Sequence, residues 1–267
     1  MFQQVYKYLD QDTLEKVASL NPEIYNYPIW NEYYFTGETK FRRLKNVICS
    51  DNVEDLDGLK EIEILYLIYG SRVTDLSSLS HCKNLRELYL NDDSRVTDLS
   101  PLSHCKNLQK LHLGHGSKVT DLSSLKECKN LQKLNLGHRS HVTDLSSLKE
   151  CKNLRVLDLG HGSKVTDLSP LSECKNLRVL SLGYGSKVTD LSPLSECKNL
   201  QVLSLGHGSK VTDLSMLKNI KELHLGKNSL VTDLSMLTNI KELHLCNNEQ
   251  FDIEKLRDIL PDAGIHE

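Results

Sequence analysis

The sequence predicts an α/β repeat solenoid, in which short strands stack as successive coils around one long core. Three observations support this prediction. From Ser71 the chain copies itself with a 23-residue period, and each copy has apolar residues at the same seven positions. Ten of the 15 aromatic residues lie between Phe2 and Phe41, so the rest of the core must be aliphatic. A fixed period of this length is typical of repeat architectures, because a single coil buries its apolar row only against its neighbours.

The repeated units divide the chain into three parts. Shorter 20-residue units begin at Ser209 and Ser229, and a divergent 20-residue unit covers 51–70. We therefore predict a helical N-terminal cap over 1–50, a solenoid of nine coils over 51–248, and a helical C-terminal cap over 249–267. The full 23-residue units begin at Ser71, Ser94, Ser117, Ser140, Ser163 and Ser186.

Each unit contains one segment with a strand pattern and one with a turn pattern. Leu85-x-x-Leu88-x-Leu90 alternates near its end, and a period of two predicts a short strand. The remaining apolar residues are three apart, which favours tight turns or short 3-10 helices over a long helix. The 20-residue units lack three residues, including the Cys, between the third apolar position and the strand, so we expect these coils to be thinner on the convex side.

The motif Leu-x-x-Leu-x-Leu recurs nine times over 51–248, with Ile in the first position at Ile62, Ile220 and Ile240. This pattern resembles the leucine-rich repeat family, and the stretch Val165–Leu171 is similar to the returning segment of internalin-type and protozoan repeats. The resemblance implies a right-handed horseshoe with a parallel sheet on its concave face. The family's Asn after the strand is mostly Gly here, and Gly permits a positive φ and a tighter bend. We expect the Thr and Asp of each Val-Thr-Asp step to make the hydrogen bonds that this Asn would make.

The C-terminal segment has the spacing of an amphipathic helix. Apolar residues stand at Ile253, Leu256, Ile259 and Leu260, and Pro261 follows them. Asp252 lies where a helix-capping residue is expected. This helix predicts a cap on the last coil, because an open solenoid would leave apolar surface and a strand edge exposed.

The N-terminal segment carries a second resemblance. Residues 5–21, followed by Trp30, resemble an F-box, although the family's opening Leu-Pro stretch is absent. An F-box before leucine-rich repeats implies a substrate receptor of an SCF-type ubiquitin ligase, with an SCF adaptor as partner. The alternative is a plain helical cap, with the amphipathic stretch 12–20 covering the first coil. The residues that would bind the adaptor are Val5, Leu9, Leu14, Val17, Leu20 and Trp30.

Six cysteines recur once per coil, at Cys82, Cys105, Cys128, Cys151, Cys174 and Cys197. Stacked strands lie ~4.7–4.9 Å apart, and coils are wider apart on the convex side. That spacing exceeds the ~3.5–4.5 Å between Cβ atoms in a disulfide. The column therefore predicts buried, reduced thiols, and reduced thiols favour a reducing compartment.

A second column follows the strands and contains His115, His138, His161 and His207, with Tyr69 and Tyr184 in the same register. We interpret it as ring stacking along a turn. A metal site is disfavoured because no carboxylate or thiolate accompanies these histidines in register, and imidazole ligands need convergent partners. We predict no metal and no cofactor.

The chain carries no pattern that predicts catalysis. It has neither a phosphate-binding Gly-rich loop before Lys-Ser/Thr nor a Ser in a nucleophile elbow. A Ser or Asp copied at equal spacing has nearly the same surroundings in each coil, so it supplies no unique catalytic geometry. We therefore predict a non-enzymatic protein with no catalytic residues.

The positions that flank the second Leu of Leu-x-x-Leu-x-Leu alternate with the core, so they face away from it. Val156, Val179 and Val202 with Asp158 predict a small apolar patch between charged ends, which is typical of a protein-binding surface. The alternative is that valine simply suits strands. The predicted binding residues are Glu87, Tyr89, Lys110, His112, Lys133, Asn135, Val156, Asp158, Val179, Ser181, Val202, Ser204, Glu222 and His224.

The net charge and the hydropathy limit the classes of function that the chain can have. A net charge of −3 gives no basic field for nucleic acid, and no apolar run reaches the ~20 residues of a membrane span. Residues 1–6 show no Sec signal. We predict a cytoplasmic, monomeric protein-interaction module that binds an unidentified protein on its concave face. The ubiquitin-ligase receptor is the alternative, and a surface or secreted adhesin is the third hypothesis, against which the thiols and the missing signal argue.

Overall fold

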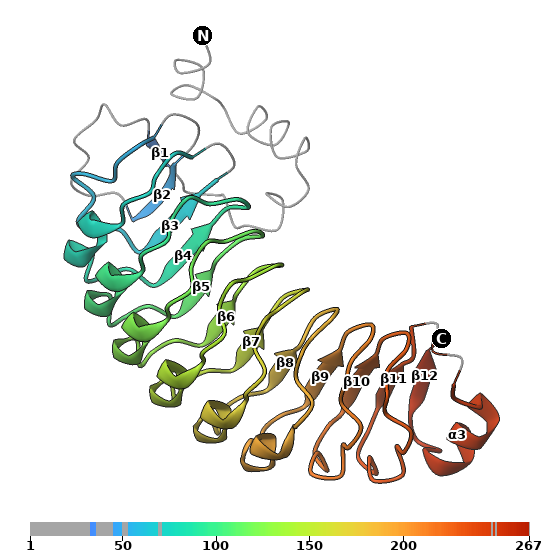
Figure 1. The fold of residues 1–267 in the computed structure, drawn as a ribbon. Helices are drawn as coiled ribbons and strands as arrows, with labels where there is room; N and C mark the ends of the chain where they lie inside the picture. Colours follow the sequence, from blue (N-terminus) through green and yellow to red (C-terminus); the bar gives the residue numbers. More distant parts are fainter. Residues whose placement is uncertain are drawn as a thin grey trace.

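This computed structural model describes residues 33–35, 45–49, 53–68, 71–246, 248 and 250–266. They form one open parallel sheet whose strands follow the order of the sequence, and the sheet lines the inner side of an arch (Figure 1). The predicted repeat solenoid is confirmed. The strands are β1 (Tyr33–Phe35), β2 (Asn46–Cys49), β3 (Ile64–Leu67), β4 (Glu87–Leu90), β5 (Lys110–His112), β6 (Lys133–Asn135), β7 (Val156–Asp158), β8 (Val179–Ser181), β9 (Val202–Leu205), β10 (Glu222–Leu225), β11 (Glu242–His244) and β12 (Gly264–His266).

Equivalent residues of successive units pair directly across the sheet. Leu111 is in register with Leu134, which is in register with Leu157. Side chains alternate along a strand, so these leucines all point inward. They belong to one continuous cluster of buried side chains that extends from Val47 to Leu260. No coil among the described residues has a core of its own, and each is stabilised by its neighbours.

The outer side of each 23-residue coil carries one short 3-10 helix, as the three-residue spacing predicted (Figure 1). At the start of η4, Asp121 Oδ1 accepts from the amide of Ser123, and Asp121 Oδ2 accepts from its hydroxyl. The Asp of the Val-Thr-Asp step thus stabilises the start of the convex helix. Our expectation that this Asp makes hydrogen bonds in the turn after the strand was wrong. The helices are η2 (Ser77–His81), η3 (Ser100–His104), η4 (Ser123–Glu127), η5 (Ser146–Glu150), η6 (Ser169–Glu173) and η7 (Ser192–Glu196).

The two 20-residue coils, between β9 and β11, return through turns and have no helix on the outer side (Figure 1). The three missing residues therefore remove the 3-10 helix, which agrees with the predicted thinning. An asparagine ladder continues across this change. Asn199 Nδ2 donates to the carbonyl of Lys175 at 2.9 Å, and Asn219 Nδ2 donates to that of Lys198 at 3.0 Å.

The C-terminal cap contains the predicted helix and an additional strand. The side chain of Asp252 accepts hydrogen bonds from the amides of Glu254 and Lys255 at the start of α3 (Ile253–Ile259). Leu256 and Leu260 are buried, but Ile259 is 49% exposed and faces away from the core. The chain then forms β12, which pairs with β11 and extends the sheet by one strand.

The sheet also begins before the predicted boundary at residue 51. β1 pairs with β2, and β2 pairs with β3. Val47 is fully buried and occupies the register position of Leu65. Two short strands without the Leu-x-x-Leu-x-Leu motif extend the sheet on this side, so the motif alone placed the boundary too late. The predicted N-terminal helix and the F-box-like residues lie outside the described residues.

No helix among the described residues is both long enough and apolar enough to cross a bilayer.

Candidate protein-binding face and histidine clusters

The structure brings the predicted binding residues together on one face. One outward column runs from Glu87 through Val179 to Glu222, and its members pair in register from strand to strand. The second column, two residues further along each strand, runs from Tyr89 to His224 in the same way. Nearly all these side chains are half-buried, and Lys133 is exposed.

Three valines form the centre of this face. Val156, Val179 and Val202 lie in register on β7, β8 and β9. Lys133 precedes them on β6, and Glu222 follows them on β10. We call Val156, Val179 and Val202 the valine patch. It is a partly exposed apolar surface with a cation at one side and an anion at the other.

Towards the N-terminus, the face contains internally paired charges. Glu87 Oε1 lies 2.8 Å from Lys110 Nζ, and Glu87 Oε2 accepts from the hydroxyl of Tyr89 at 2.7 Å. The ring of Tyr89 stacks on Tyr66, with centroids 4.6 Å apart. Tyr66 is buried, although its position in the strand predicts an outward side chain. These residues are held in place by one another.

Asp158, one of the predicted binding residues, makes hydrogen bonds within the fold. Its Oδ1 accepts from the amide of Gly160 at 2.9 Å, and its Oδ2 accepts from Asn135 Nδ2 at 3.1 Å. Asn135 Oδ1 in turn accepts from the amide of Gly137 at 2.7 Å. Asn135 and Asp158 thus each stabilise the turn that follows their own strand, and these internal hydrogen bonds use part of their hydrogen-bonding capacity.

The histidine column after the strands is a continuous stack of rings, as predicted. The centroids of His115 and His138 are 3.9 Å apart, and those of His161 and Tyr184 are 4.1 Å apart. The rings also bind the next coil, because His161 Nδ1 accepts from the amide of Tyr184 at 3.0 Å. Burial lowers the pKa of His138, and the neighbouring His115 and His161 lower it further.

The prediction that no carboxylate accompanies this column was wrong. Asp92 Oδ2 lies 3.5 Å from His115 Nδ1. Asp92 also accepts from the amide of His115 at 2.7 Å through Oδ1. Asp92 precedes His115 by one repeat, and it takes the place of a histidine in the stack. Tyr69, also assigned to this column, lies outside the described residues.

The cysteine column is buried, as predicted, and it has a hydrogen-bonding role. Cys105 Sγ donates to the carbonyl of Leu79 at 3.3 Å, and each later member does the same one coil further on. Burial raises the pKa of the Cys105 thiol to about 12. Cys246 is exposed, in contrast to the other seven cysteines.

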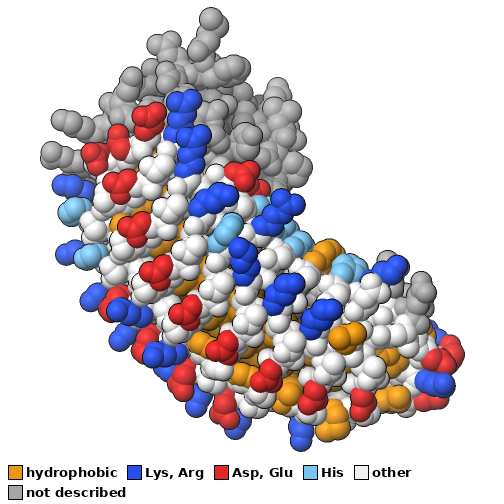
Figure 2. Space-filling model, viewed as in Figure 1, with side chains coloured by type: hydrophobic (Ala, Val, Ile, Leu, Met, Phe, Trp, Pro, Cys, Tyr) orange, Lys and Arg blue, Asp and Glu red, His pale blue; other side chains and the backbone are white. Residues whose placement is uncertain are grey.

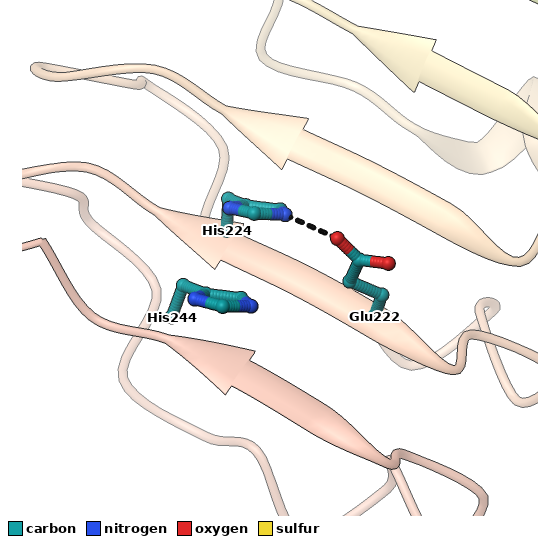
Figure 3. A group of neighbouring side chains, drawn as sticks. All are labelled: Glu222, His224 and His244. Carbon is teal, nitrogen blue, oxygen red and sulfur yellow. Dashed lines mark hydrogen bonds and ion pairs between the residues drawn. The ribbon is translucent and has the colours of Figure 1, made fainter. Parts of the chain in front are cut away.

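A second group of histidines, which the sequence pattern did not predict, lies at the C-terminal end of the concave face. His224, His244 and His266 stack with centroids 4.3 and 4.5 Å apart. Glu222 lies beside His224, and their side chains point toward one another (Figure 3). Burial lowers the pKa of His244, and the neighbouring His224 and His266 lower it further. The available signal was the repeated Glu-Leu-His of β10 and β11, but His266 joins the group only through β12.

A family model described as leucine-rich repeats in two copies matches residues 83–127, 106–150, 129–173 and 175–219, which together make up just over half of the chain. The chain belongs to the leucine-rich repeat family.

Solved leucine-rich repeat structures share its fold. An internalin from Listeria monocytogenes is 26% identical, with a TM-score of 0.60, over 84% of this chain and 72% of that one. Internalin C2 from the same species is 30% identical, with a TM-score of 0.55, over 63% of this chain and 74% of that one. A leucine-rich repeat protein from Leptospira interrogans is 18% identical, with a TM-score of 0.52, over 85% of this chain and 73% of that one. This similarity shows the fold alone. No curated protein sequence matches the chain.

Charge on the flank of this leucine-rich repeat solenoid is balanced. Figure 2 shows rows of acidic and of basic side chains that cross one face along its length. The aspartates of the Val-Thr-Asp steps are exposed, and so are the Lys and Arg residues that precede most of those valines. Because the two signs alternate at short range, this flank presents no extended field of one sign to nucleic acid or anionic lipid.

Proposed function

We propose that this protein is a non-enzymatic interaction module that binds a protein partner on the concave face of its solenoid. The observation that carries the proposal is the valine patch, three half-buried apolar side chains in register between Lys133 and Glu222. An apolar centre within a polar rim is typical of protein-binding surfaces.

The contrast between the core-facing positions and the outward positions supports the concave face as the binding face. Positions facing the core keep Leu and Cys from coil to coil, whereas the outward positions change from Tyr and Glu through Val and Ser to His. A partner that contacts several coils would therefore meet a different side chain on each strand. The convex 3-10 helices vary less, since each has the pattern Ser-Ser/Pro-Leu followed by Ser or Lys and then His or Glu, so they distinguish one coil from the next less well.

The absence of a catalytic role is proposed on the same structural grounds. In successive coils, Asp98, Asp121 and Asp144 each accept from a serine two residues later, in the same arrangement. Side chains with such repeated partners serve the fold. A location in a reducing compartment is likewise a proposal, supported by seven buried thiols.

The two other functional hypotheses stay predictions. Adaptor binding by an F-box rests on residues outside the described part of the chain. The adhesin hypothesis rests on the internalin-type repeat, and the similarity to internalins supports that repeat type.

The test compares a charge on the concave face with a charge on the convex side. We would isolate a partner from lysate by affinity capture, identify it by mass spectrometry, and measure its affinity for each variant by calorimetry. Val179→Glu should weaken binding by ~1–3 kcal/mol, because it buries an unpaired charge at the centre of the interface. Val179→Thr, with nearly the same shape, should have a smaller effect.

Lys198→Glu is the matched control. Lys198 is exposed and follows η7 on the convex side, so its charge reversal should leave the affinity nearly unchanged. Urea unfolding of all variants would show whether the fold is intact. If the convex change weakens binding and the concave change does not, the binding face is assigned wrongly.

A further inference from the structure

Three strands at the C-terminal end of the concave face place five potential metal ligands together. β10, β11 and β12 pair in register, so His224, His244 and His266 occupy one rung across the sheet. Glu222 and Glu242 each precede a histidine by two residues. Residues two apart on a strand share a face, so the two carboxylates lie on the same side as the imidazoles.

The ligand atoms of these side chains converge in two overlapping triads. Glu222, His224 and His244 each offer one ligand atom, and these atoms all lie within 4.8 Å of one another. Glu242, His244 and His266 form a second triad of the same kind. Figure 3 shows the first, with the ring of His244 parallel to that of His224 and Glu222 directed at the nitrogen of His224. No other such triad occurs among the described residues.

The absence of a side chain at Gly264 makes the second triad possible. Gly264 is in register with Glu242. A Cβ at this position would lie 2.6 Å from Glu242 Oε2 and 3.3 Å from His266 Nε2. The carboxylate therefore leans across β12 and reaches the next histidine, with 2.7 Å between Glu242 Oε2 and His266 Nε2.

We propose that this cluster binds one divalent transition-metal ion of the zinc class, with His244 as the ligand common to both triads. Two imidazole nitrogens and one carboxylate oxygen form a ligand set that zinc accepts, with a fourth position left for water. Imidazole suits zinc, copper and nickel, whereas calcium and magnesium prefer sites made of oxygen alone. A neutral imidazole has one lone pair for a metal, so His244 completes one triad at a time and the stoichiometry is one ion per chain.

The side chains have room for the small movement that binding requires. The planes of His224 and His244 are within 4° of parallel, so at least one ring must rotate to direct its lone pair at a shared ion. The side chains of His224 and Glu222 are 34% and 38% exposed. The ion replaces the proton in the 2.7 Å hydrogen bond between Glu222 and His224.

The test is calorimetric titration of tag-free protein with zinc chloride. Cys246 is exposed and could bind zinc by itself, so every variant would carry Cys246→Ser. We expect one zinc per chain. His244→Ala, which removes the ligand common to both triads, should weaken binding by roughly tenfold or more. Glu222→Gln keeps the shape and the hydrogen-bonding capacity of the side chain, and it should also weaken binding.

His138→Ala is the matched control, because His138 lies in the other imidazole stack and belongs to neither triad. It should bind zinc with unchanged affinity, and calcium should bind to none of the variants. Urea unfolding without metal would confirm that all variants fold. Cobalt(II) absorption should show a four-coordinate spectrum that is lost in His244→Ala.

Unchanged zinc affinity in His244→Ala, or an equal loss in His138→Ala, would overturn the proposal, as would the absence of binding to the parent protein. The cluster adjoins the valine patch, since Glu222 pairs with Val202. The titration requires no protein partner, so its result is independent of the proposed interaction function.

Discussion

Gly137 lies against the backbone of Gly114 so closely that a Cβ on Gly137 would overlap the carbonyl oxygen of Gly114. The same relationship joins Gly160 to Gly137 and Gly183 to Gly160. These residues follow the strands at one position per coil. Only a hydrogen fits between adjacent coils there, so this column sets how closely the coils approach after the sheet.

Gly137→Ala should therefore destabilise the protein by about 2–4 kcal/mol. The added methyl group forces two backbone segments apart, and Gly137 also has a φ of +72°, which an L-residue adopts at a cost. Urea unfolding measures the loss.

Gly185→Asn is the matched control for that substitution. Gly185 also has a positive φ, but a Cβ there meets no atom within 4 Å. Asn228 occupies the equivalent position of a later coil at φ +59°. This variant should lose less than about 1 kcal/mol. Equal losses of stability in Gly137→Ala and Gly185→Asn would show that the contact between coils does not determine how much each substitution destabilises the protein.

Stability should be distributed unevenly along the solenoid. Leu157 and Leu243 are both fully buried. Leu157→Ala should cost about 2–5 kcal/mol, because it opens a cavity that coils on both sides line. Leu243→Ala near the end should cost less, because terminal coils open locally at a lower free energy. Urea unfolding compares them, and equal losses would contradict nearest-neighbour stabilisation.

The core and the repeat could be predicted from the sequence because one requirement recurs in each coil. Leu111, Leu134 and Leu157 face the same surroundings, so the 23-residue period determined both the strand and its register. The strands added at the two ends could not be found this way. Val47 and Ile265 each fill a leucine position only once, and a single apolar residue has no periodicity to detect.

The candidate sites were predictable only in part. Alternation along each strand predicted that Val156, Val179 and Val202 face outward, and the 23-residue period placed them side by side. The sequence indicated only part of the histidine group on β10, β11 and β12. The repeated Glu-Leu-His was the signal for His224 and His244, whereas the register of His266 depends on the path of the chain through α3, which no repeat specifies. The sequence also did not predict that Asp158 stabilises a turn, since the hydrogen bond that it accepts from the Gly160 amide depends on the geometry of that turn.

The thiols should differ sharply in reactivity. Cys246 is exposed, and the other seven cysteines are buried. Burial raises the pKa of Cys128 and of Cys174 to about 12, so almost no thiolate is present at neutral pH. Ellman's reagent should react quickly with one thiol in the folded protein and with all eight in urea. A disulfide between Cys82 and Cys105, detected by mass spectrometry in fresh protein, would contradict this arrangement.

The stack around His138 should make stability depend on pH. Burial and the flanking His115 and His161 lower its pKa in the folded protein, while Asp92 and Asp158 oppose that shift. In the unfolded chain the ring titrates near pH 6.5. Below that pH the unfolded chain binds more protons than the folded one, so acidification favours unfolding. The urea concentration at the midpoint of unfolding should therefore decrease when the pH is lowered from about 7.5 to about 5.5.

His138→Tyr separates this ring from the other titrating groups. Tyr184 already occupies the same position of a later coil and stacks on His161, so the repeat accepts tyrosine there. The variant should keep the stack while removing a group whose protonation opposes folding. Its urea midpoint should fall less on acidification than that of the parent protein. A fall of the same size in both proteins would mean that His138 does not cause the pH dependence.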